Sequence, residues 1–139
     1  MTDDPAQTFL REYAAAVLER DLPRFVELYA EDVQVFDSWD RWEYAGRDAW
    51  AGMIASWFDG IRDTRVRVIA KDVQTWIGAD VAGGSATLEF AALDEHGQPQ
   101  RSIENRQTVL LQRRQGRWLA VHQHTSVPVD FQSKQVVAR

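Results

Sequence analysis

The sequence of 139 residues contains no cysteine. Without thiols the chain can form no disulfide, hold no metal through thiolates and offer no cysteine nucleophile. Long apolar runs are missing too, since no stretch approaches the ~20 apolar residues that a membrane-spanning helix needs. The first residues are acidic and polar, unlike the basic start and apolar run of a secretion signal. We therefore expect a cytoplasmic protein with no membrane partner.

Basic residues are also scarce. Lysine and arginine together number 16 against 21 acidic residues, which gives a formal net charge of −5. Nucleic-acid binding requires a basic footprint. The one basic cluster, Arg113, Arg114 and Arg117, flanks a predicted turn at Gly116, so we interpret it as a solvated turn and expect no nucleic-acid partner.

Apolar and aromatic residues, by contrast, are plentiful. Hydrophobic residues make up 45% of the chain, which has six tryptophans, and large aromatics can line a pocket as well as fill a core. A chain of this length suits one domain and can bury about two-thirds of its unfolded surface. Because no linker, repeat or low-complexity segment interrupts it, we expect a single domain over residues 1–139.

Helix signals dominate the first part of the chain. Asp4 before Pro5 marks a helix start, and apolar residues then recur at helical spacing. Asp21 can cap a second, short helix. Residues 46–48 lead into a third, whose apolar face includes Trp57.

Strand signals follow. Residues 33–38 alternate in polarity and predict a strand, with a returning strand at 42–45. Short turns then separate four long strands near 64–77, 80–93, 100–114 and 117–127. Such strands form an antiparallel meander, and helices packed on one of its faces give an α+β fold. The tail, 128–139, is expected to be a loose end or an arm.

Two regions resemble a known superfamily. One is Leu-Tyr-Ala-Glu-Asp-Val-Gln-Val-Phe-Asp at 28–37, followed by Gly-Arg-Asp-Ala-Trp at 46–50. The other, at 115–128, contains Gly-x-Trp and then Val-His-x-His-x-Ser. Together they resemble the nuclear transport factor 2-like superfamily, and within it the SnoaL-like, ketosteroid isomerase-related branch. The last strand also resembles the calmodulin-dependent kinase association domain.

This resemblance implies a cystatin-like cone, in which N-terminal helices pack on a curved, mainly antiparallel sheet. It also implies a pocket for a small organic ligand at the open end, and a homodimer, often formed through the outer face of the sheet. The superfamily contains isomerases, dehydratases and cyclases as well as binding modules and assembly hubs. Function must therefore be argued from the site.

The resemblance implies two catalytic residues. Asp37 ends the first strand, where ketosteroid isomerases carry their proton-shuttling aspartate. Burial would raise its pKa and suit it to act as a general base, whereas the alternative is a turn aspartate that caps local N–H groups. Tyr13 lies where those isomerases place a hydrogen-bond donor for the substrate oxygen. The alternative is a core tyrosine.

The pattern then departs from the isomerases, which carry a second acidic donor on the next-to-last strand. Counting from the two flanking turns leads to Arg106 and Thr108 as the residues at that position. Neither is a carboxylic acid, so steroid isomerisation itself is not expected. Glu104 shares a face with both, because residues two apart on a strand point the same way. We assign these three to substrate binding, with Arg106 orienting a negative or carbonyl group. The alternative is that the row faces solvent or a partner subunit.

The last strand offers a His-x-His pair. His122 and His124 could ligate a metal only with a third ligand. Leu119 and Val121 alternate with the histidines along the strand, which suggests that the odd-numbered residues face the core and the histidines face away from it. We therefore expect no metal, place the histidines at a subunit interface, and add Gln123 and Thr125 to the substrate-binding residues. Kinase association domains carry an arginine where Thr125 stands, so their anion binding is not carried over.

These residues favour a small-molecule pocket. If the protein is an enzyme, it should be a cofactor-free isomerase, cyclase or dehydratase of a carbonyl compound. Asp37 would be the base, Tyr13 would stabilise the oxygen, and Trp57 would cover a flat ligand unless it belongs to the core. The alternative function is a non-catalytic ligand-binding or hub-like oligomerisation domain.

Overall fold

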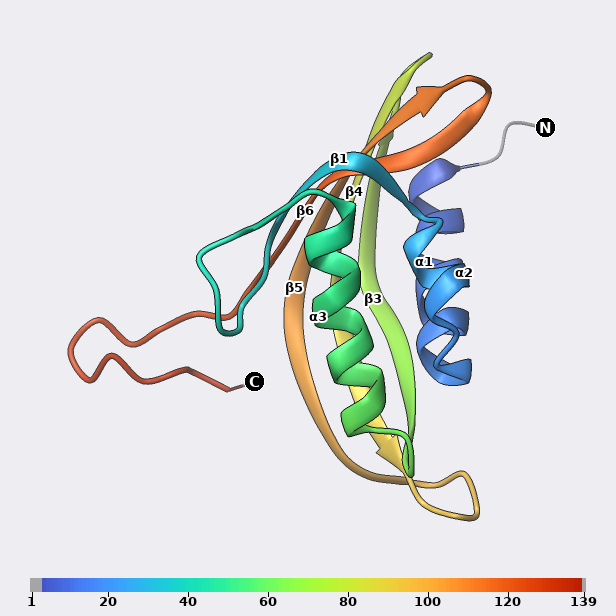
Figure 1. Ribbon diagram of the computed structural model, residues 1–139. Helices are drawn as coiled ribbons and strands as arrows, with labels where there is room; N and C mark the ends of the chain where they lie inside the picture. The colour runs from blue at the N-terminus through green and yellow to red at the C-terminus, as the bar shows by residue number, and fades with distance from the viewer. Residues whose placement is uncertain (1–3, 139) are drawn as a thin grey trace.

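The computed structural model describes residues 4–138, which form three helices and a six-stranded sheet (Figure 1). The helices are α1 (Pro5–Glu19), α2 (Leu22–Val26) and α3 (Arg47–Gly60). The strands are β1 (Tyr29–Phe36), β2 (Tyr44–Ala45), β3 (Arg65–Ile77), β4 (Val81–Leu93), β5 (Pro99–Arg114) and β6 (Arg117–Ser126).

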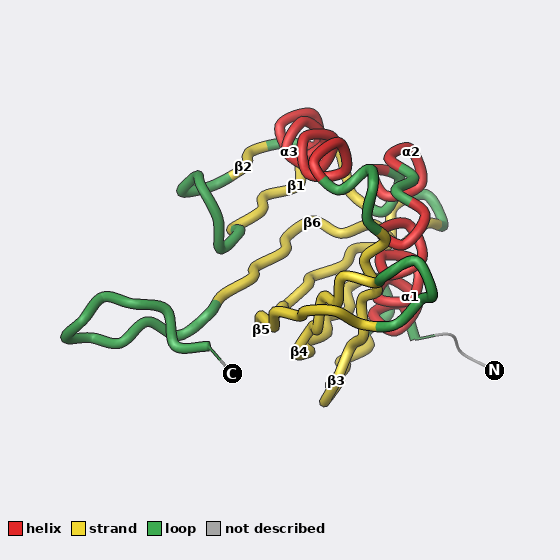
Figure 2. Tube along the Cα trace, turned by 90° about the horizontal axis from the view of Figure 1, so that it is seen from below, coloured by secondary structure: helices red, strands yellow, loops and turns green. Residues whose placement is uncertain are grey.

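The sheet has the order β2-β1-β6-β5-β4-β3. All neighbouring strands are antiparallel except β1 and β6, which run parallel. Figure 2 shows the sheet curving around the space between α1 and α3. The predicted α+β class and the helix-covered, mainly antiparallel sheet are confirmed.

The helix starts follow the predicted capping residues. Asp4 Oδ1 accepts hydrogen bonds from the backbone N–H groups of Ala6 and Gln7, at 3.0 and 3.2 Å, with Pro5 in the first turn. Asp21 caps α2 through the N–H of Arg24. Such caps satisfy backbone donors that have no partner within the helix.

An aromatic cluster fills the space between α1, α2, α3 and β1. Phe25 is fully buried, and its ring centroid lies 5.0 Å from that of Tyr13 and 5.4 Å from that of Tyr29. Phe58 of α3 meets Phe25 edge to face at 5.9 Å. Rings at these distances bury large apolar areas in favourable geometry, so this end of the molecule is solidly packed.

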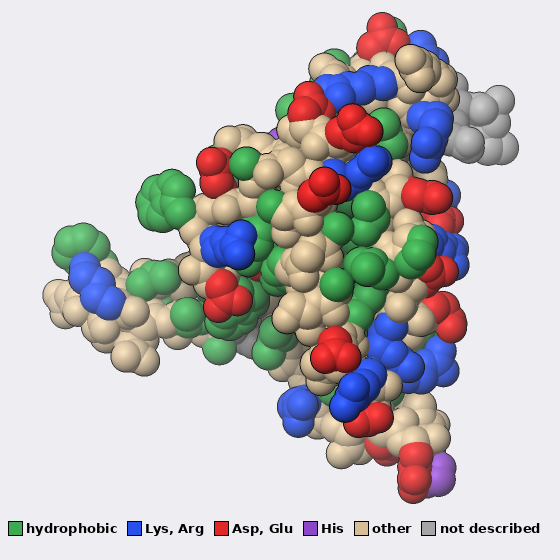
Figure 3. All heavy atoms as spheres, viewed as in Figure 1, with side chains coloured by type: hydrophobic (Ala, Val, Ile, Leu, Met, Phe, Trp, Pro, Cys, Tyr) green, Lys and Arg blue, Asp and Glu red, His purple; other side chains and the backbone are tan. Residues whose placement is uncertain are grey.

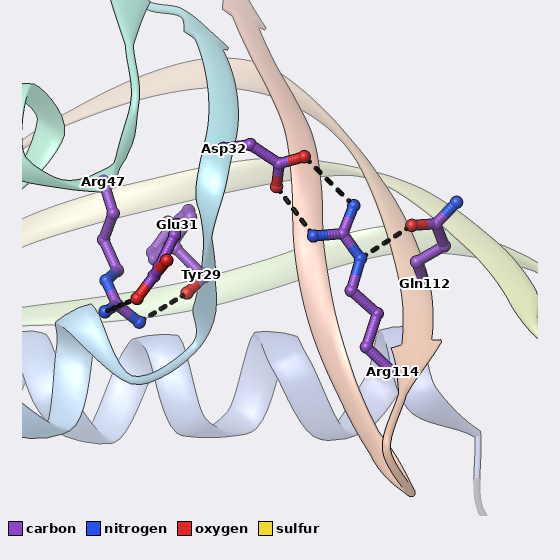
Figure 4. Close-up of polar contacts among 6 residues, drawn as sticks. All are labelled: Tyr29, Glu31, Asp32, Arg47, Gln112 and Arg114. Carbon is purple, nitrogen blue, oxygen red and sulfur yellow. Dashed lines mark hydrogen bonds and ion pairs between the residues drawn. The ribbon is translucent and has the colours of Figure 1, made fainter.

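Polar contacts fix β1 at its outer edge (Figure 4). The Arg114 guanidinium donates to both carboxylate oxygens of Asp32, at 2.7 and 3.3 Å, and to Gln112 at 2.8 Å. The hydrogen bond from Arg114 holds the pKa of the exposed Asp32 carboxyl below its ordinary value. Arg47, at the start of α3, donates to the Tyr29 carbonyl at 3.4 Å. These contacts tie β1 to the β5–β6 hairpin and to α3.

Bulges interrupt the strand register at two places that bear on the site. In the β4–β5 pair, Arg101 lies opposite Ala92 and Pro99 opposite Leu93, so Gln100 is an extra residue. In the β5–β6 pair, Val121 is extra. A bulge bends the strand and shifts its alternation by one residue. The core therefore contains Ala120, and the predicted core positions Leu119 and Val121 are only half-buried.

The tail forms an arm that projects from the end of β6 (Figure 1). Its two branches meet at a bridge between Val129 and Val136, and Asp130 accepts a hydrogen bond from the Ser133 N–H at 2.8 Å. Figure 3 shows hydrophobic side chains on this arm, where the ring of Phe131 is 84% exposed. Such exposed apolar groups are typical of contact surfaces.

Gly84 lets α1 lie directly on β4, because a Cβ at this position would stand 2.7 Å from the Ala6 Cβ. We expect Gly84→Ala to lower the free energy of unfolding by about 1–3 kcal/mol, the usual cost of overpacking. Urea denaturation measures the change. Gly83→Ala is the matched control, because a Cβ there meets its nearest atom, the Val109 carbonyl oxygen, at an ordinary 3.5 Å. Equal stability of the two variants would contradict this account.

Candidate functional site

A cavity of about 970 Å³ opens between α3 on one side and strands β4 and β5 on the other. The loop between β1 and β2 closes one end. Of the predicted site residues, Tyr13, Asp37, Trp57 and Thr125 line this cavity. They come from α1, the end of β1, α3 and β6, so residues distant in the sequence meet in one hollow.

Asp37 directly follows β1, where parallel pairing with β6 sets Phe36 beside His124. Thr125 Oγ1 donates a 2.9 Å hydrogen bond to Asp37 Oδ1. The same threonine oxygen accepts from the Ser38 N–H at 3.0 Å. This relay anchors one carboxylate oxygen and fixes the orientation of the group.

The other carboxylate oxygen, Asp37 Oδ2, is buried and has no hydrogen-bond partner among residues 4–138. Burial raises the pKa of the Asp37 carboxyl above its ordinary value, and the hydrogen bond from Thr125 offsets part of that rise. A carboxylate with one anchored and one unpartnered oxygen is suited to accept a proton.

Tyr13 belongs to the buried face of α1 and reaches the cavity from the packed end. Burial, and then the charge of Asp37, raise the pKa of the Tyr13 phenol, while the neighbouring Gln107 amide lowers it by a smaller amount. The phenol therefore keeps its proton at physiological pH and can act as a hydrogen-bond donor.

Gln107 of β5 is a residue that the sequence analysis missed. Its side chain is 2% exposed and lies beside the Tyr13 hydroxyl, but neither amide atom makes a hydrogen bond of ordinary geometry within the described chain. It stands opposite Thr125 in the sheet register. Two residues earlier on the same face, Asn105 lines the cavity, and its Oδ1 also lacks a partner. Unpartnered buried amides are costly unless a ligand or water completes them.

The expected inward orientation of Glu104, Arg106 and Thr108 is wrong. Glu104 lies 3.7 Å from Lys71, and Arg106 Nε donates to Ser126 Oγ at 3.1 Å, both on the outer face. Thr108 is exposed.

The register of β5 explains the error. Val109 and Gln107 are buried, so alternation turns the even-numbered residues outward. The bulge at Gln100 shifts the count from the preceding turn by one, and Leu110 beside Leu111 leaves the sequence pattern ambiguous.

Of the predicted residues Gln123 and Trp57, only Trp57 lines the cavity. Gln123 is fully buried, as its parity indicated, but it accepts a hydrogen bond from the Tyr29 hydroxyl and lies outside the cavity wall. Trp57 forms part of the wall, where its ring meets Phe90 of β4 edge to face at 6.0 Å. One of these two predicted substrate-binding residues therefore reaches the cavity.

His122 and His124 lie on the outer face, where both rings contact Phe36, at 4.9 and 5.5 Å between centroids. Within residues 4–138, no three histidine, aspartate or glutamate side chains are grouped as metal ligands would be. No helix of this described part has the length and apolar character to cross a membrane.

Three solved structures with the same fold share 17–21% sequence identity with this chain. A nuclear transport factor 2-like protein from Pseudomonas putida is 21% identical over 95% of this chain and 90% of its own, with a TM-score of 0.82. A cystatin-like protein from Caulobacter vibrioides is 21% identical over 91% and 89%, at 0.69. A Xanthomonas campestris protein, provisionally named a calcium/calmodulin-dependent protein kinase II association domain, is 17% identical over 86% and 80%, at 0.66.

These similarities show the cystatin-like fold. No curated protein matches the chain significantly. The model of the SnoaL-like domain family matches residues 6–130, which include the three helices except Pro5, the whole sheet and every residue of the cavity. The chain therefore belongs to the SnoaL-like domain family of the nuclear transport factor 2-like superfamily.

Proposed function

We propose that this SnoaL-like domain is a small-molecule enzyme that transfers a proton on a carbonyl compound without a cofactor. The observation that carries the proposal is the unpartnered, buried Oδ2 of Asp37 in a cavity that Tyr13 also lines. A base and an oxygen-stabilising donor at one cavity are the two groups that enolisation requires.

In the first step Asp37 takes a proton from the carbon next to the carbonyl. The C–H electron pair forms a C=C bond, and the carbonyl electrons move to the oxygen, where the Tyr13 hydroxyl stabilises the charge. Return of the proton from Asp37 to another carbon gives an isomer. In a dehydration the C–O bond of a neighbouring hydroxyl breaks, and the leaving oxygen takes the proton from Asp37 to become water. In a cyclisation the enolate carbon forms a bond to a second carbonyl carbon, whose C=O electrons move to its oxygen, and that oxygen takes the proton from Asp37. None of these steps changes the oxidation state overall.

Gln107 supports a further part of this proposal. Its Nε2 makes no hydrogen bond of ordinary geometry in the described chain, and Gln107 lies beside Tyr13 but outside the residues that line the cavity. An amide N–H there would give the developing oxyanion a second donor, at the strand where the isomerases carry an acid. A neutral amide is a weaker donor than a carboxylic acid, so we expect a more modest rate than in the steroid isomerases.

We expect Asp37→Asn to slow proton transfer by about 100-fold or more, because it removes the base. The measurement is deuterium exchange at the α-carbon of 2-tetralone, a flat bicyclic ketone, followed by NMR in D₂O. The ketone should still bind, since the amide is nearly isosteric. Asp72→Asn, on the exposed bulge of β3, is the control and should exchange at the wild-type rate. Unchanged exchange with Asp37→Asn would refute the proposed base.

The exchange rate should rise with pH as Asp37 loses its proton, with a midpoint above the ordinary aspartate value of about 3.9. Thr125→Val removes a hydrogen bond that favours the charged carboxylate, so the pKa rises further and the profile moves to higher pH. Thr108→Val, on the exposed face of β5, should leave the profile unchanged. A shift of the Thr125→Val profile to lower pH would contradict this assignment.

A non-catalytic oligomerisation domain is the second candidate. It is favoured by the exposed apolar residues of the arm, and the Xanthomonas campestris neighbour bears the name of an association domain. We propose a homodimer as the simplest assembly.

Light scattering on a size-exclusion column should therefore give about twice the chain mass of 15.9 kDa. Phe131→Asp on the arm should shift the mass towards that of the monomer, and Glu95→Asp in the exposed β4–β5 turn is the control. A monomeric wild-type protein would exclude the homodimer, and a larger ring would favour a hub.

A further inference from the structure

The cavity is longer than a reaction centre requires. Along α3 its wall runs from Asp48 to Gly60, about 18 Å at the helical rise. Along β5 the wall reaches Arg101, six residues from Gln107, which stands opposite Thr125. Six residues of strand span about 20 Å. Asp37 therefore lies at one end of an elongated trough and Arg101 at the other.

The middle of the trough is apolar and open. Trp57 and Met53 of α3, Phe90 of β4 and Ile103 of β5 form its walls. Gly52 of α3 also lines the trough at an exposed position, where an added Cβ would meet no atom within 4 Å. The trough therefore has room for an extended apolar body beside the helix.

The far end carries a free cation. Within the described residues, the exposed Arg101 guanidinium has neither a carboxylate nor a hydrogen-bond partner. The opposite end, near the β1–β2 loop and the start of α3, carries the three acids that line the cavity, Asp37, Asp40 and Asp48, and one cation, Arg41, whose guanidinium lies over the Tyr44 ring, so its formal charge is negative. A ligand with a carboxylate is attracted to Arg101 and repelled by these acids, which fixes its direction.

We propose that the trough binds an elongated amphipathic carboxylate, with its acid group on Arg101 and its apolar chain along α3. The assignment of a substrate class rests on the proposed function. With proton transfer at Asp37, the substrate is a medium-chain oxo acid whose carbonyl reaches Asp37 and Tyr13. Binding of the carboxylate itself requires neither of those two residues.

Calorimetric titration with hexanoate, octanoate and decanoate tests the proposal. Each added methylene should tighten Kd about fourfold, which corresponds to about 0.8 kcal/mol per buried CH₂. Arg101→Gln should weaken decanoate binding by about tenfold and leave decan-1-ol binding unchanged. Arg117→Gln, at the exposed β5–β6 turn, is the matched control and should bind decanoate as the wild type does.

Gly52→Leu gives a second readout, because it adds an apolar side chain at a position that lines the trough and where a Cβ meets no atom within 4 Å. This variant should abolish the gain in affinity from hexanoate to decanoate, while its circular dichroism spectrum stays that of the wild type. Equal decanoate affinity in wild type and Arg101→Gln, or no dependence on chain length, would overturn the proposal. Either result leaves the proton-transfer test on 2-tetralone unaffected, so the two failures can be told apart.

Discussion

The parallel pairing of β1 with β6 is the contact on which the site depends. Every other pair in the sheet is antiparallel and joins strands that follow one another closely in the chain. The β1–β6 pair instead joins strands about 90 residues apart, and its register sets Val35 beside Gln123 and Phe36 beside His124. Asp37 and Thr125 then become neighbours at the next position. One non-local register thus creates the hydrogen bond that orients the carboxylate.

Most of the buried polar atoms without partners in the described chain lie around this register; the exceptions are Trp50 Nε1 beside the aromatic cluster and Arg67 Nε on β3. Asp37 Oδ2, the Gln107 amide, Asn105 Oδ1 and Gln123 Nε2 are all buried without hydrogen bonds in the described chain. Each such group costs about 1–3 kcal/mol. The aromatic cluster around Phe25 supplies compensating apolar burial at the other end of the fold. The molecule therefore divides into a packed half that stabilises the domain and an under-satisfied half that is available for a ligand.

Local signals in the sequence were enough to predict the helices and strands. Asp4, Pro5 and Asp21 begin helices as their side chains predict, and the strands end within a few residues of the predicted turns. The resemblance in residues 28–37 led to Asp37, and the alternation along the last strand led to Thr125; the two lie together at the cavity.

Which residues of β5 point towards the core could not be predicted in the same way. Gln100 and Val121 are bulge residues because they have no partner on the neighbouring strand. The local sequence pattern carries no information about that pairing. Leu110 and Leu111 are equally apolar, although only Leu111 is buried. Gln107 escaped notice for this reason, and Glu104, Arg106 and Thr108 were assigned inward in its place. Knowledge of which residue stands opposite Gln107 would have been needed, and only the folded sheet supplies it.

The close approach of α1 to Gly84 has a consequence for evolution of the site. Ala6 lies on the sheet at the first turn of α1, and Tyr13 follows it two turns later on the same buried face. A rigid helix converts a small lift at one end into a tilt along its length, so a methyl group gained at Ala6 or Gly84 would displace the Tyr13 hydroxyl from its alignment with Asp37. Selection for the geometry of the cavity would then act on two small residues that do not line it.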